Sequence, residues 1–303
     1  MRILEEKNNE DKKKNTDNFK NFSNEVIFKK ALIYHSQGKI SKAEEYYKFL
    51  IEKGLKDSVV FSNYGLILQE LCKLEEAESY TRKAIKLNPN FANAHSNLGN
   101  ILIDLDNLEE AELHTRKAIK LNPNFANAHS NLGIILMNLG NLGEAELHTR
   151  KAIKLNPNLA NAYSNLGNIL RELGNFSESE FYIRKAIKLV PDFANAYYSL
   201  GVVLKDLGKL EEAEFNIRKA IELKSDFGEA YFVLGKLLNV SEKLDDAFEN
   251  YKKAYELGID FDRYISEIGD LNLKEGNYFE GLRNLKAGHG YILFDLKKGF
   301  SIN

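Results

Sequence analysis

Cysteine, proline and long apolar runs are all scarce in this sequence of 303 residues. Its one cysteine, Cys72, excludes an intrachain disulfide framework and a zinc site built from several cysteines. No run is long and apolar enough to span a bilayer, and the charged start MRILEEKNNEDKKK lacks the apolar segment of a signal peptide. These absences predict a soluble cytoplasmic protein with no membrane association.

Neither sign of charge is in excess. The sequence has 42 lysines and arginines against 44 aspartates and glutamates, a formal net charge of −2. A dedicated nucleic-acid-binding protein usually carries a large basic excess, so nucleic acid is not expected as a partner. The charged fraction of 28% beside 11% aromatic residues is typical of a folded chain rather than a disordered one.

The four prolines, in contrast, are regularly placed. Each lies 34 residues after the one before, at Pro89, Pro123, Pro157 and Pro191. The twelve letters NPNFANAHSNLG occur at 88–99 and again at 122–133. Such self-similarity at a fixed period indicates a repeat protein.

The same register extends beyond the prolines and predicts eight units of 34 residues, at 24–57, 58–91, 92–125, 126–159, 160–193, 194–227, 228–261 and 262–295. A polar leader, residues 1–23, precedes the units and is expected to be flexible. Residues 296–303 form a short C-terminal tail. No insertion interrupts the spacing, so no second domain is expected inside the array.

Each unit carries two helical patterns joined by a tight turn and ended by the proline. In residues 92–105 the apolar positions share one helix face, and in residues 108–121 they do so again. Glycine usually occupies the turn, where a left-handed backbone ends a helix. Cys72, Asp106 and Glu242 replace that glycine, and these turns are expected either to close differently or to be strained.

Small residues recur at one position of the first helices, namely Gly65, Gly99, Gly133, Gly167, Gly201, Gly235 and Gly269. A glycine within a helix costs about 1 kcal/mol relative to alanine, so a row of them indicates a close approach of backbones. Because no single hairpin can bury its apolar face alone, the units are expected to stack into an α-solenoid.

The conserved intervals within one unit run through Leu98, Gly99, Leu102, Ala111, Ala118 and Pro123. This pattern resembles the tetratricopeptide repeat, and the likeness covers most of the chain. The resemblance implies an all-α solenoid of about eight stacked helix-turn-helix units in a right-handed superhelix, with the first helices on the concave side. Since such arrays are chiefly protein-interaction scaffolds, it also implies a protein or peptide partner.

Neither an enzyme nor a metal or cofactor site is predicted. The sequence contains no HExxH, GxSxG, Walker-type or GxGxxG motif, so no catalytic residue is assigned. His95 and His129 occupy a position that is Tyr163 in a later unit, so core packing explains them. Repeats also hold equivalent residues about a helix pair apart, whereas a metal needs several ligands around one point.

Asparagine follows the face of the first helices opposite their packing stripe, at Asn63, Asn93, Asn97, Asn100, Asn127, Asn131, Asn161, Asn165, Asn168 and Asn195. An amide offers both a donor and an acceptor, so it can pair with a peptide unit without reading side chains. The row is similar to the asparagine-lined groove of O-linked N-acetylglucosamine transferases, which holds polypeptide by its backbone. The sequence therefore predicts a peptide-binding groove, while the simpler alternative is a tolerated polar residue on a solvated face.

Three further interpretations concern partners. In the units from 58–91 to 228–261, no lysine or arginine stands at the second, fifth or sixth position of the first helix, so a clamp for a terminal carboxylate is not expected. Pairs such as Glu112 and Arg116, four residues apart on the second helices, indicate helix electrostatics, with a phosphate- or RNA-binding stripe as the weaker alternative. The alternative to an independent scaffold is a substrate-recognition arm of a modifying enzyme, in association with a glycosyltransferase.

Overall fold

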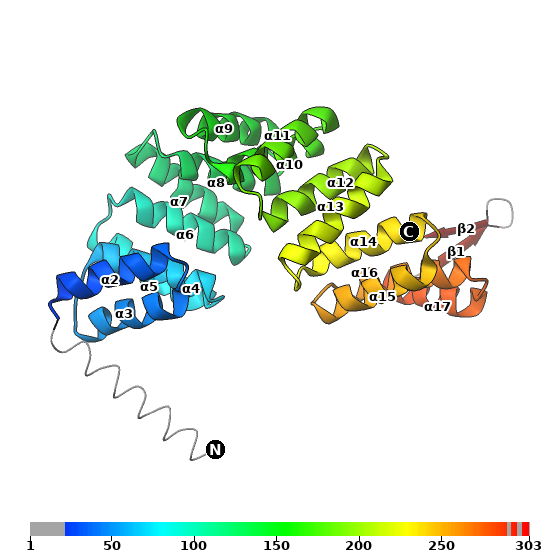
Figure 1. Cartoon of the computed structure of the whole chain (residues 1–303), viewed down its shortest axis with the longest axis horizontal. Helices are drawn as coiled ribbons and strands as arrows, with labels where there is room; N and C mark the ends of the chain where they lie inside the picture. The colour runs from blue at the N-terminus through cyan, green and yellow to red at the C-terminus, as the bar shows by residue number, and fades with distance from the viewer. Residues whose placement is uncertain (1–21, 290–291, 296–298, 303) are drawn as a thin grey trace, which may run out of the picture. The chain divides into compact units, whose positions relative to one another are not determined.

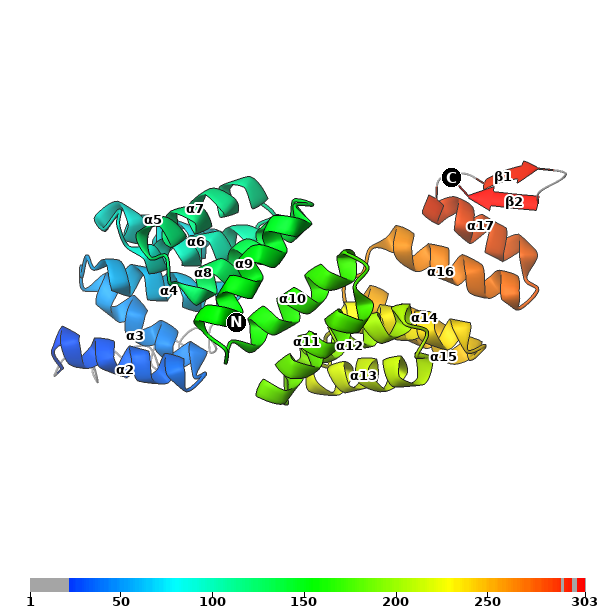
Figure 2. The ribbon, with the colours of Figure 1, turned by 90° about the horizontal axis from the view of Figure 1, so that it is seen from above.

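The computed structural model describes residues 22–289, 292–295 and 299–302, in which the helices follow one another as hairpins (Figures 1 and 2). The chain divides into two compact units, Met1–Pro157 and Asn158–Asn303, which we call unit 1 and unit 2. Of the predicted leader 1–23, only Phe22 and Ser23 are among the described residues, and the Ser23 side chain caps the first helix.

The described helices of unit 1 are α2 (Asn24–Ser36), α3 (Ile40–Glu52), α4 (Ser58–Glu70), α5 (Leu74–Leu87), α6 (Ala92–Asp104), α7 (Leu108–Leu121), α8 (Ala126–Asn138) and α9 (Leu142–Leu155). Those of unit 2 are α10 (Ala160–Glu172), α11 (Phe176–Leu189), α12 (Ala194–Asp206), α13 (Leu210–Leu223), α14 (Gly228–Val240), α15 (Leu244–Glu256), α16 (Phe261–Lys274) and α17 (Tyr278–His289). Even-numbered helices are the first of each hairpin and are called A helices; odd-numbered helices are called B helices. The predicted all-α array of stacked hairpins is thereby confirmed.

Within each unit, successive hairpins bury their apolar faces against one another. Leu98 and Leu102 of α6 form one buried cluster with Ala111 of α7 and Ile135 of α8, so three successive helices share it. At the N-terminal end of unit 1, a larger cluster around Tyr47 and Ile67 joins α2, α3, α4 and α5. A hairpin taken alone would leave these side chains in water, which is the physical reason for the stacking.

The glycine row marks the contact between the two helices of each hairpin. A Cβ atom on Gly99 would collide with the Thr115 hydroxyl and would lie 3.3 Å from the carbonyl oxygen of Ala111. In unit 2, a Cβ on Gly201 would lie 2.6 Å from the Ile217 side chain. The predicted close approach is confirmed, and it explains why this position stays glycine while the facing B-helix residue changes.

The turns inside the hairpins close in the same way with or without glycine. Gly140 has φ +78°, and Cys72, Asp106 and Glu242 have φ +56°, +56° and +59°. The hydrogen bonds also match, because Asp106 N donates to Ile103 O at 3.0 Å just as Gly140 N donates to Met137 O at 3.0 Å. The sequence allowed two alternatives, a different turn or a strained one. The structure shows the second, because the turn has the same geometry as in the glycine-containing hairpins and the non-glycine residue is strained.

The end of the array departs from the repeat. After α17, two short antiparallel strands follow, β1 (Ile292–Asp295) and β2 (Gly299–Ile302), with Ile292 opposite Ile302. Figure 2 shows this hairpin beside α17. The last predicted unit, 262–295, is thus helical only through His289, and the predicted tail 296–303 contains β2. Among the described residues no helix is long and apolar enough to cross a membrane.

Candidate functional site

The A helices that carry the asparagine row leave one narrow stripe uncovered by the packing. In α6, Asn93 is exposed and Asn97 and Asn100 are half-buried, whereas Ala94 and Leu98 are buried. These three asparagines occupy the second, sixth and ninth positions of the helix, which lie on one side of it. We call this stripe the A-helix face.

The asparagine row divides between the two units. Unit 1 holds Asn63 on α4, Asn93, Asn97 and Asn100 on α6, and Asn127 and Asn131 on α8. Unit 2 holds Asn161, Asn165 and Asn168 on α10 and Asn195 on α12. Within unit 1, α6 contacts both α4 and α8, and within unit 2, α10 contacts α12, so each unit carries its own stretch of the row.

The amides at the second and sixth positions differ in their surroundings. Asn93, Asn127, Asn161 and Asn195, at the second position, are all exposed, whereas Asn63, Asn97, Asn131 and Asn165, at the sixth, are half-buried. Asn97 Nδ2 donates to the hydroxyl oxygen of Ser62 on the preceding A helix at 2.9 Å. Ser62 is only 1% exposed, so this bond satisfies a buried hydroxyl and ties α6 to α4.

This serine contact is a feature that the sequence analysis missed. Serine directly precedes the asparagine of the sixth position in four units, at Ser62, Ser96, Ser130 and Ser164, and all four serines are buried. Their spacing of 34 residues was visible in the sequence, but the direction in which a hydroxyl points is fixed only by the packing. Asn97 therefore has a structural bond in addition to any ligand contact, whereas Asn93 is exposed.

The charged residues at the ends of the A helices are paired with one another. In unit 1, Gln69 Nε2 donates to Asp104 Oδ2 at 2.6 Å. In unit 2, Arg171 Nε donates to Asp206 Oδ2 at 2.6 Å, and Arg263 forms two bonds to Glu229 at 2.8 and 3.0 Å. The two arginines are thus neutralised by carboxylates of neighbouring A helices.

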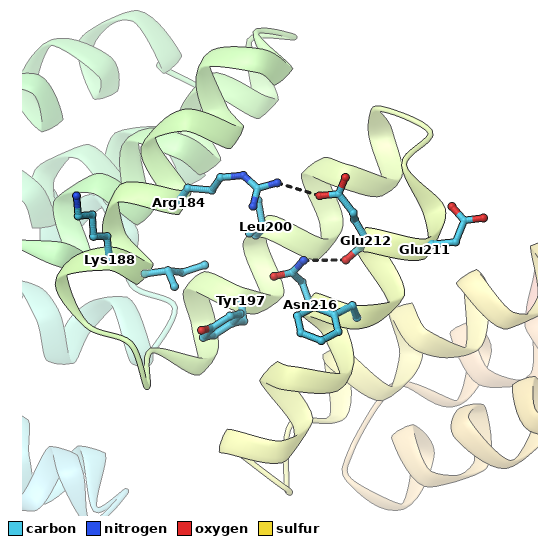
Figure 3. A pocket seen from close by; sticks show the side chains of 9 residues that line it. Arg184, Lys188, Tyr197, Leu200, Glu211, Glu212 and Asn216 are labelled. Carbon is cyan, nitrogen blue, oxygen red and sulfur yellow. Dashed lines mark hydrogen bonds and ion pairs between the residues drawn. The ribbon is translucent and has the colours of Figure 1, made fainter.

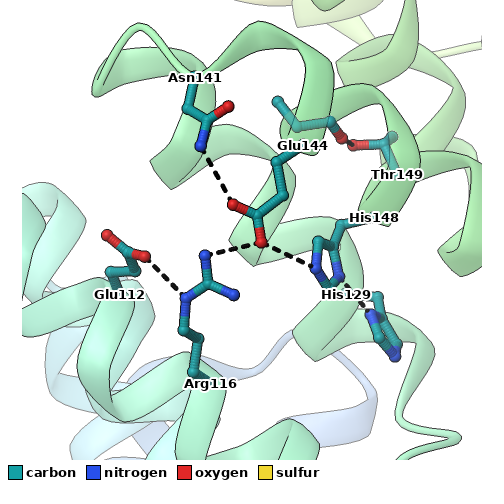
Figure 4. Close-up of polar contacts among 8 residues, drawn as sticks. Glu112, Arg116, His129, Asn141, Glu144, His148 and Thr149 are labelled. Carbon is teal, nitrogen blue, oxygen red and sulfur yellow. Dashed lines mark hydrogen bonds and ion pairs between the residues drawn. The ribbon is translucent and has the colours of Figure 1, made fainter.

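The B helices carry their charges between hairpins. Arg116 Nε donates to Glu112 at 2.7 Å, as the spacing predicts, but Arg116 Nη2 also donates to Glu144 on the next B helix at 2.8 Å (Figure 4). In unit 2, Arg184 joins Glu180 to Glu212 in the same way, and Figure 3 shows its bond to Glu212. The Arg116 guanidinium lowers the pKa of Glu144. The charges predicted to serve each helix thus also connect the hairpins, which favours a structural role over a nucleic-acid-binding stripe.

The histidines form pairs that the sequence analysis did not anticipate. His95 Nδ1 lies 2.9 Å from His114 Nδ1, and His129 Nδ1 lies 2.8 Å from His148 Nδ1 (Figure 4). The Nε2 atom of His95 lies 3.1 Å from the carbonyl oxygen of Pro89, an acceptor, so this nitrogen carries the proton. Burial lowers the pKa of all four rings, which keeps them neutral near pH 7.

The two rings of each pair face each other through their Nδ1 atoms. No group of three or more histidine, cysteine, aspartate or glutamate residues that could hold a metal ion occurs in the described part of the chain. Glu110 approaches His114 on the side of Nε2, at 3.7 Å, away from the two facing Nδ1 atoms. The pair is therefore a packed, hydrogen-bonded contact between the A and B helices of one hairpin.

Comparison with known families agrees with this geometry. One model of the tetratricopeptide repeat matches residues 92–125, 126–159 and 160–193, and a second matches 25–52, 60–91 and 194–227. Together the matched segments span more than half of the chain. The chain belongs to the tetratricopeptide repeat family. Proteins of this family generally serve protein–protein interaction, and both matching models describe the repeat itself.

Solved structures of tetratricopeptide repeat proteins share the fold. A chain of the APC/C hetero-tetramer Cut9–Hcn1 matches with a TM-score of 0.71 and 16% identity, over 80% of this chain and 47% of that one. A tetratricopeptide repeat protein from Parabacteroides merdae matches with a TM-score of 0.63 and 21% identity, over 82% and 98%. PilF of Pseudomonas aeruginosa matches with a TM-score of 0.56 and 21% identity, over 65% and 90%. The search of curated proteins gave no match to this tetratricopeptide repeat protein.

Proposed function

We propose that this chain is a non-catalytic scaffold that binds an extended polypeptide on its A-helix faces through the amides of the asparagine row. The observation that carries the proposal is the exposure of Asn93, Asn127, Asn161 and Asn195, while the alanine that follows each of them is buried. A carboxamide can donate to a peptide carbonyl and accept from a peptide N–H at once. The row therefore matches the repeating chemistry of a polypeptide backbone.

The spacing of the helices fits an extended ligand. Packed helices lie about 8–10 Å apart, and an extended chain advances about 3.3 Å per residue. If one exposed amide is presented per hairpin, consecutive amides meet about every third residue of the ligand. Such contacts leave the side chains of the ligand unread, so we expect broad sequence tolerance within each unit.

The test is to select peptides from a random-sequence phage library on the whole chain and to measure their binding by fluorescence anisotropy. Replacing Asn93, Asn127, Asn161 and Asn195 together by alanine should weaken binding about tenfold or more, since each lost amide bond is worth about 1 kcal/mol. The matched control replaces Asn90 and Asn124, exposed asparagines in the loops between hairpins, and should leave binding unchanged.

Recognition of the peptide backbone gives a second expectation for the same peptides. Methylation of the backbone nitrogen at every third residue should abolish binding in one of three registers, whereas side-chain changes should have small effects. Equal loss from the loop variant, or full binding by all N-methylated peptides, would show that the asparagine row is not the binding surface.

The same amides support the second candidate, a substrate-recognition arm acting with a separate glycosyltransferase. The specific observation that favours it is the similarity of the asparagine row to the groove of those transferases. Co-purification of a glycosyltransferase with the wild-type chain, lost when the four exposed asparagines are replaced, would favour this alternative. Incubation of the chain alone with activated sugar donors should give no turnover in either case.

A further inference from the structure

Four successive hairpins fill a slot between their own two helices with a pair of rings. Phe61 faces Tyr80 with ring centroids 6.0 Å apart, and the two histidine pairs occupy the same positions with centroids 5.1 Å apart. In the first hairpin of unit 2, Tyr163 stacks on Tyr182 with centroids 6.2 Å apart and planes at 24°. One ring comes from the fourth position of the A helix and the other from the B helix.

The second hairpin of unit 2 lacks the ring from its B helix. Tyr197 of α12 occupies the A-helix position, but the residue 34 positions after Tyr182 is Asn216. Asn216 turns back onto its own helix, where its Nδ2 donates to the carbonyl oxygen of Glu212 at 2.7 Å. A pocket of about 620 Å³ opens beside it, between α11, α12 and α13 (Figure 3).

The walls of this pocket combine apolar side chains with charged and polar ones. Ile187, Leu200 and the Tyr197 ring line it together with Phe215, whose side chain is 68% exposed. Its volume is within the range of pockets that bind ligands, and an apolar lining with few polar groups is typical of them. The side-chain N–H of Asn216 donates to the Glu212 carbonyl oxygen, so the side-chain oxygen of Asn216 remains as an acceptor in the wall of the pocket.

The charged residues around the pocket differ in whether they have an ion-pair partner. Arg184 is held by Glu180 and Glu212, so its charge is already balanced. Lys188 has no acidic partner among the residues that the structure describes. Glu211 also lines the pocket, but it lies at the opposite end from Lys188 in Figure 3. The Lys188 end of the pocket is therefore complementary to a negative charge.

We propose that this pocket binds an aromatic side chain of a protein partner, with an acidic residue next to it that meets Lys188. The bound ring takes the place that Tyr182 fills in the preceding hairpin and covers the exposed Phe215. This site is separate from the asparagine row, because the fourth and second positions of α12, Tyr197 and Asn195, are about 200° apart around the helix. A partner could thus engage unit 2 at two faces of the same helix.

The test uses N-acetyl-Asp-Phe-amide as a probe and maps backbone amide chemical shifts of the whole chain during a titration. Shifts should centre on Tyr197 and Phe215. Replacing Asn216 by tyrosine, the residue of the preceding hairpin, should fill the pocket and weaken binding about tenfold or more, given the apolar burial of one phenyl ring. Asn250→Tyr is the matched control, because Asn250 is the next equivalent residue and makes the same bond to the carbonyl oxygen of Asp246 at 2.7 Å.

The acidic residue is tested with a second probe, N-acetyl-Asn-Phe-amide. It should bind about two- to fivefold more weakly to the wild type, as for an exposed ion pair, and Lys188→Gln should remove the difference between the probes. Glu211→Gln should preserve it. If Asn216→Tyr does not fold, Phe215→Ala replaces it, since its exposed side chain is not needed for the core.

Two results would overturn the proposal. One is undiminished binding by a folded Asn216→Tyr or Phe215→Ala variant, and the other is a set of shifts that centres away from α11, α12 and α13. Equal binding of the two probes would overturn the acidic part. Because the four exposed asparagines of the A-helix faces do not line the pocket, their replacement should leave probe binding unchanged. Failure of this site is thus distinguishable from failure of the asparagine row.

Discussion

His95 and His114 face each other through their Nδ1 atoms at 2.9 Å, which leaves room for one proton between them. The Nε2 nitrogen of His95 donates to Pro89, so in the neutral pair His95 Nδ1 accepts from His114 Nδ1–H. Protonation of both rings would set two N–H donors against each other. The hydrogen bond between His95 and His114 therefore exists only while at least one ring is neutral.

This pairing predicts acid sensitivity. Burial lowers the pKa of His95, His114, His129 and His148 in the folded state, so the unfolded chain binds more protons and stability rises with pH in this range. We expect the contribution of these histidines to the free energy of unfolding to be present in full above about pH 6.5, which is their pKa in the unfolded chain. This contribution should be lost as the pH falls from there toward the lower pKa values of the folded state.

The neighbouring charges do not reverse this sign. Lys117 lowers the pKa of His95, and Arg82 lowers that of His114. Glu110 raises the pKa of His114, but burial is the larger effect. The measurement is urea unfolding at pH 7.5, 6.5 and 5.5, with a variant that carries tyrosine at all four positions, as the Tyr163–Tyr182 hairpin does. A variant with the same pH dependence as the wild type would contradict the assignment.

The glycine row predicts opposite effects of one substitution at two sites. Gly99→Ala should lower the free energy of unfolding by about 1–3 kcal/mol, because its Cβ meets the Thr115 side chain in a packed contact. Gly143→Ala, in a helical position with nothing within 4 Å of the added Cβ, should raise it by about 0.5–1 kcal/mol. Chemical unfolding of both variants is the measurement, and an unchanged midpoint for Gly99→Ala would show that the hairpin can open there.

Strain at the turns that lack glycine predicts that introducing glycine there stabilises the protein. Cys72 has φ +56°, is exposed and lies in a turn that Gly140 closes with φ +78°. Cys72→Gly should therefore raise the free energy of unfolding by about 0.5–1 kcal/mol, the relief of strain being partly offset by the freedom of glycine in the unfolded chain. Gly140→Ala is the control and should be destabilising by a similar amount. A loss of stability in Cys72→Gly would mean that the thiol makes a needed contact.

The asparagine row predicts two kinds of amide. Asn97→Ala should cost about 1–2 kcal/mol of folding free energy, because it leaves the buried Ser62 hydroxyl without its donor. Asn93→Ala removes an exposed side chain and should change stability by less than about 0.5 kcal/mol. Thermal unfolding of the two single variants separates the structural part of the row from the part available to a ligand. Equal stabilities would remove the structural role of the Asn97–Ser62 bond.

Features that depend on interactions between residues close in sequence could be predicted from the sequence, whereas those that depend on the packing of distant residues could not. Residues such as Gly99 and Ala111 recur at a fixed interval, and a fixed interval defines a hairpin because backbone sterics and apolar periodicity act locally. The turn at Asp106 was correctly marked as exceptional, although only the backbone shows that it is strained rather than rebuilt. The strands after His289 fell outside the periodic pattern, and a unit drawn by register alone ran past the end of α17.

The sequence by itself determined the repeat length, the pairing of helices and the solvent-facing row of amides, because each of these follows from which residues recur on one side of a helix. The tertiary structure decided which partners those residues meet. Arg116 with Glu144, His129 with His148 and Asn97 with Ser62 join different helices, and the residues that line the pocket beside Asn216 come from three helices. Directions and distances between helices arise from the packing of many side chains at once, which no single position in a repeat encodes.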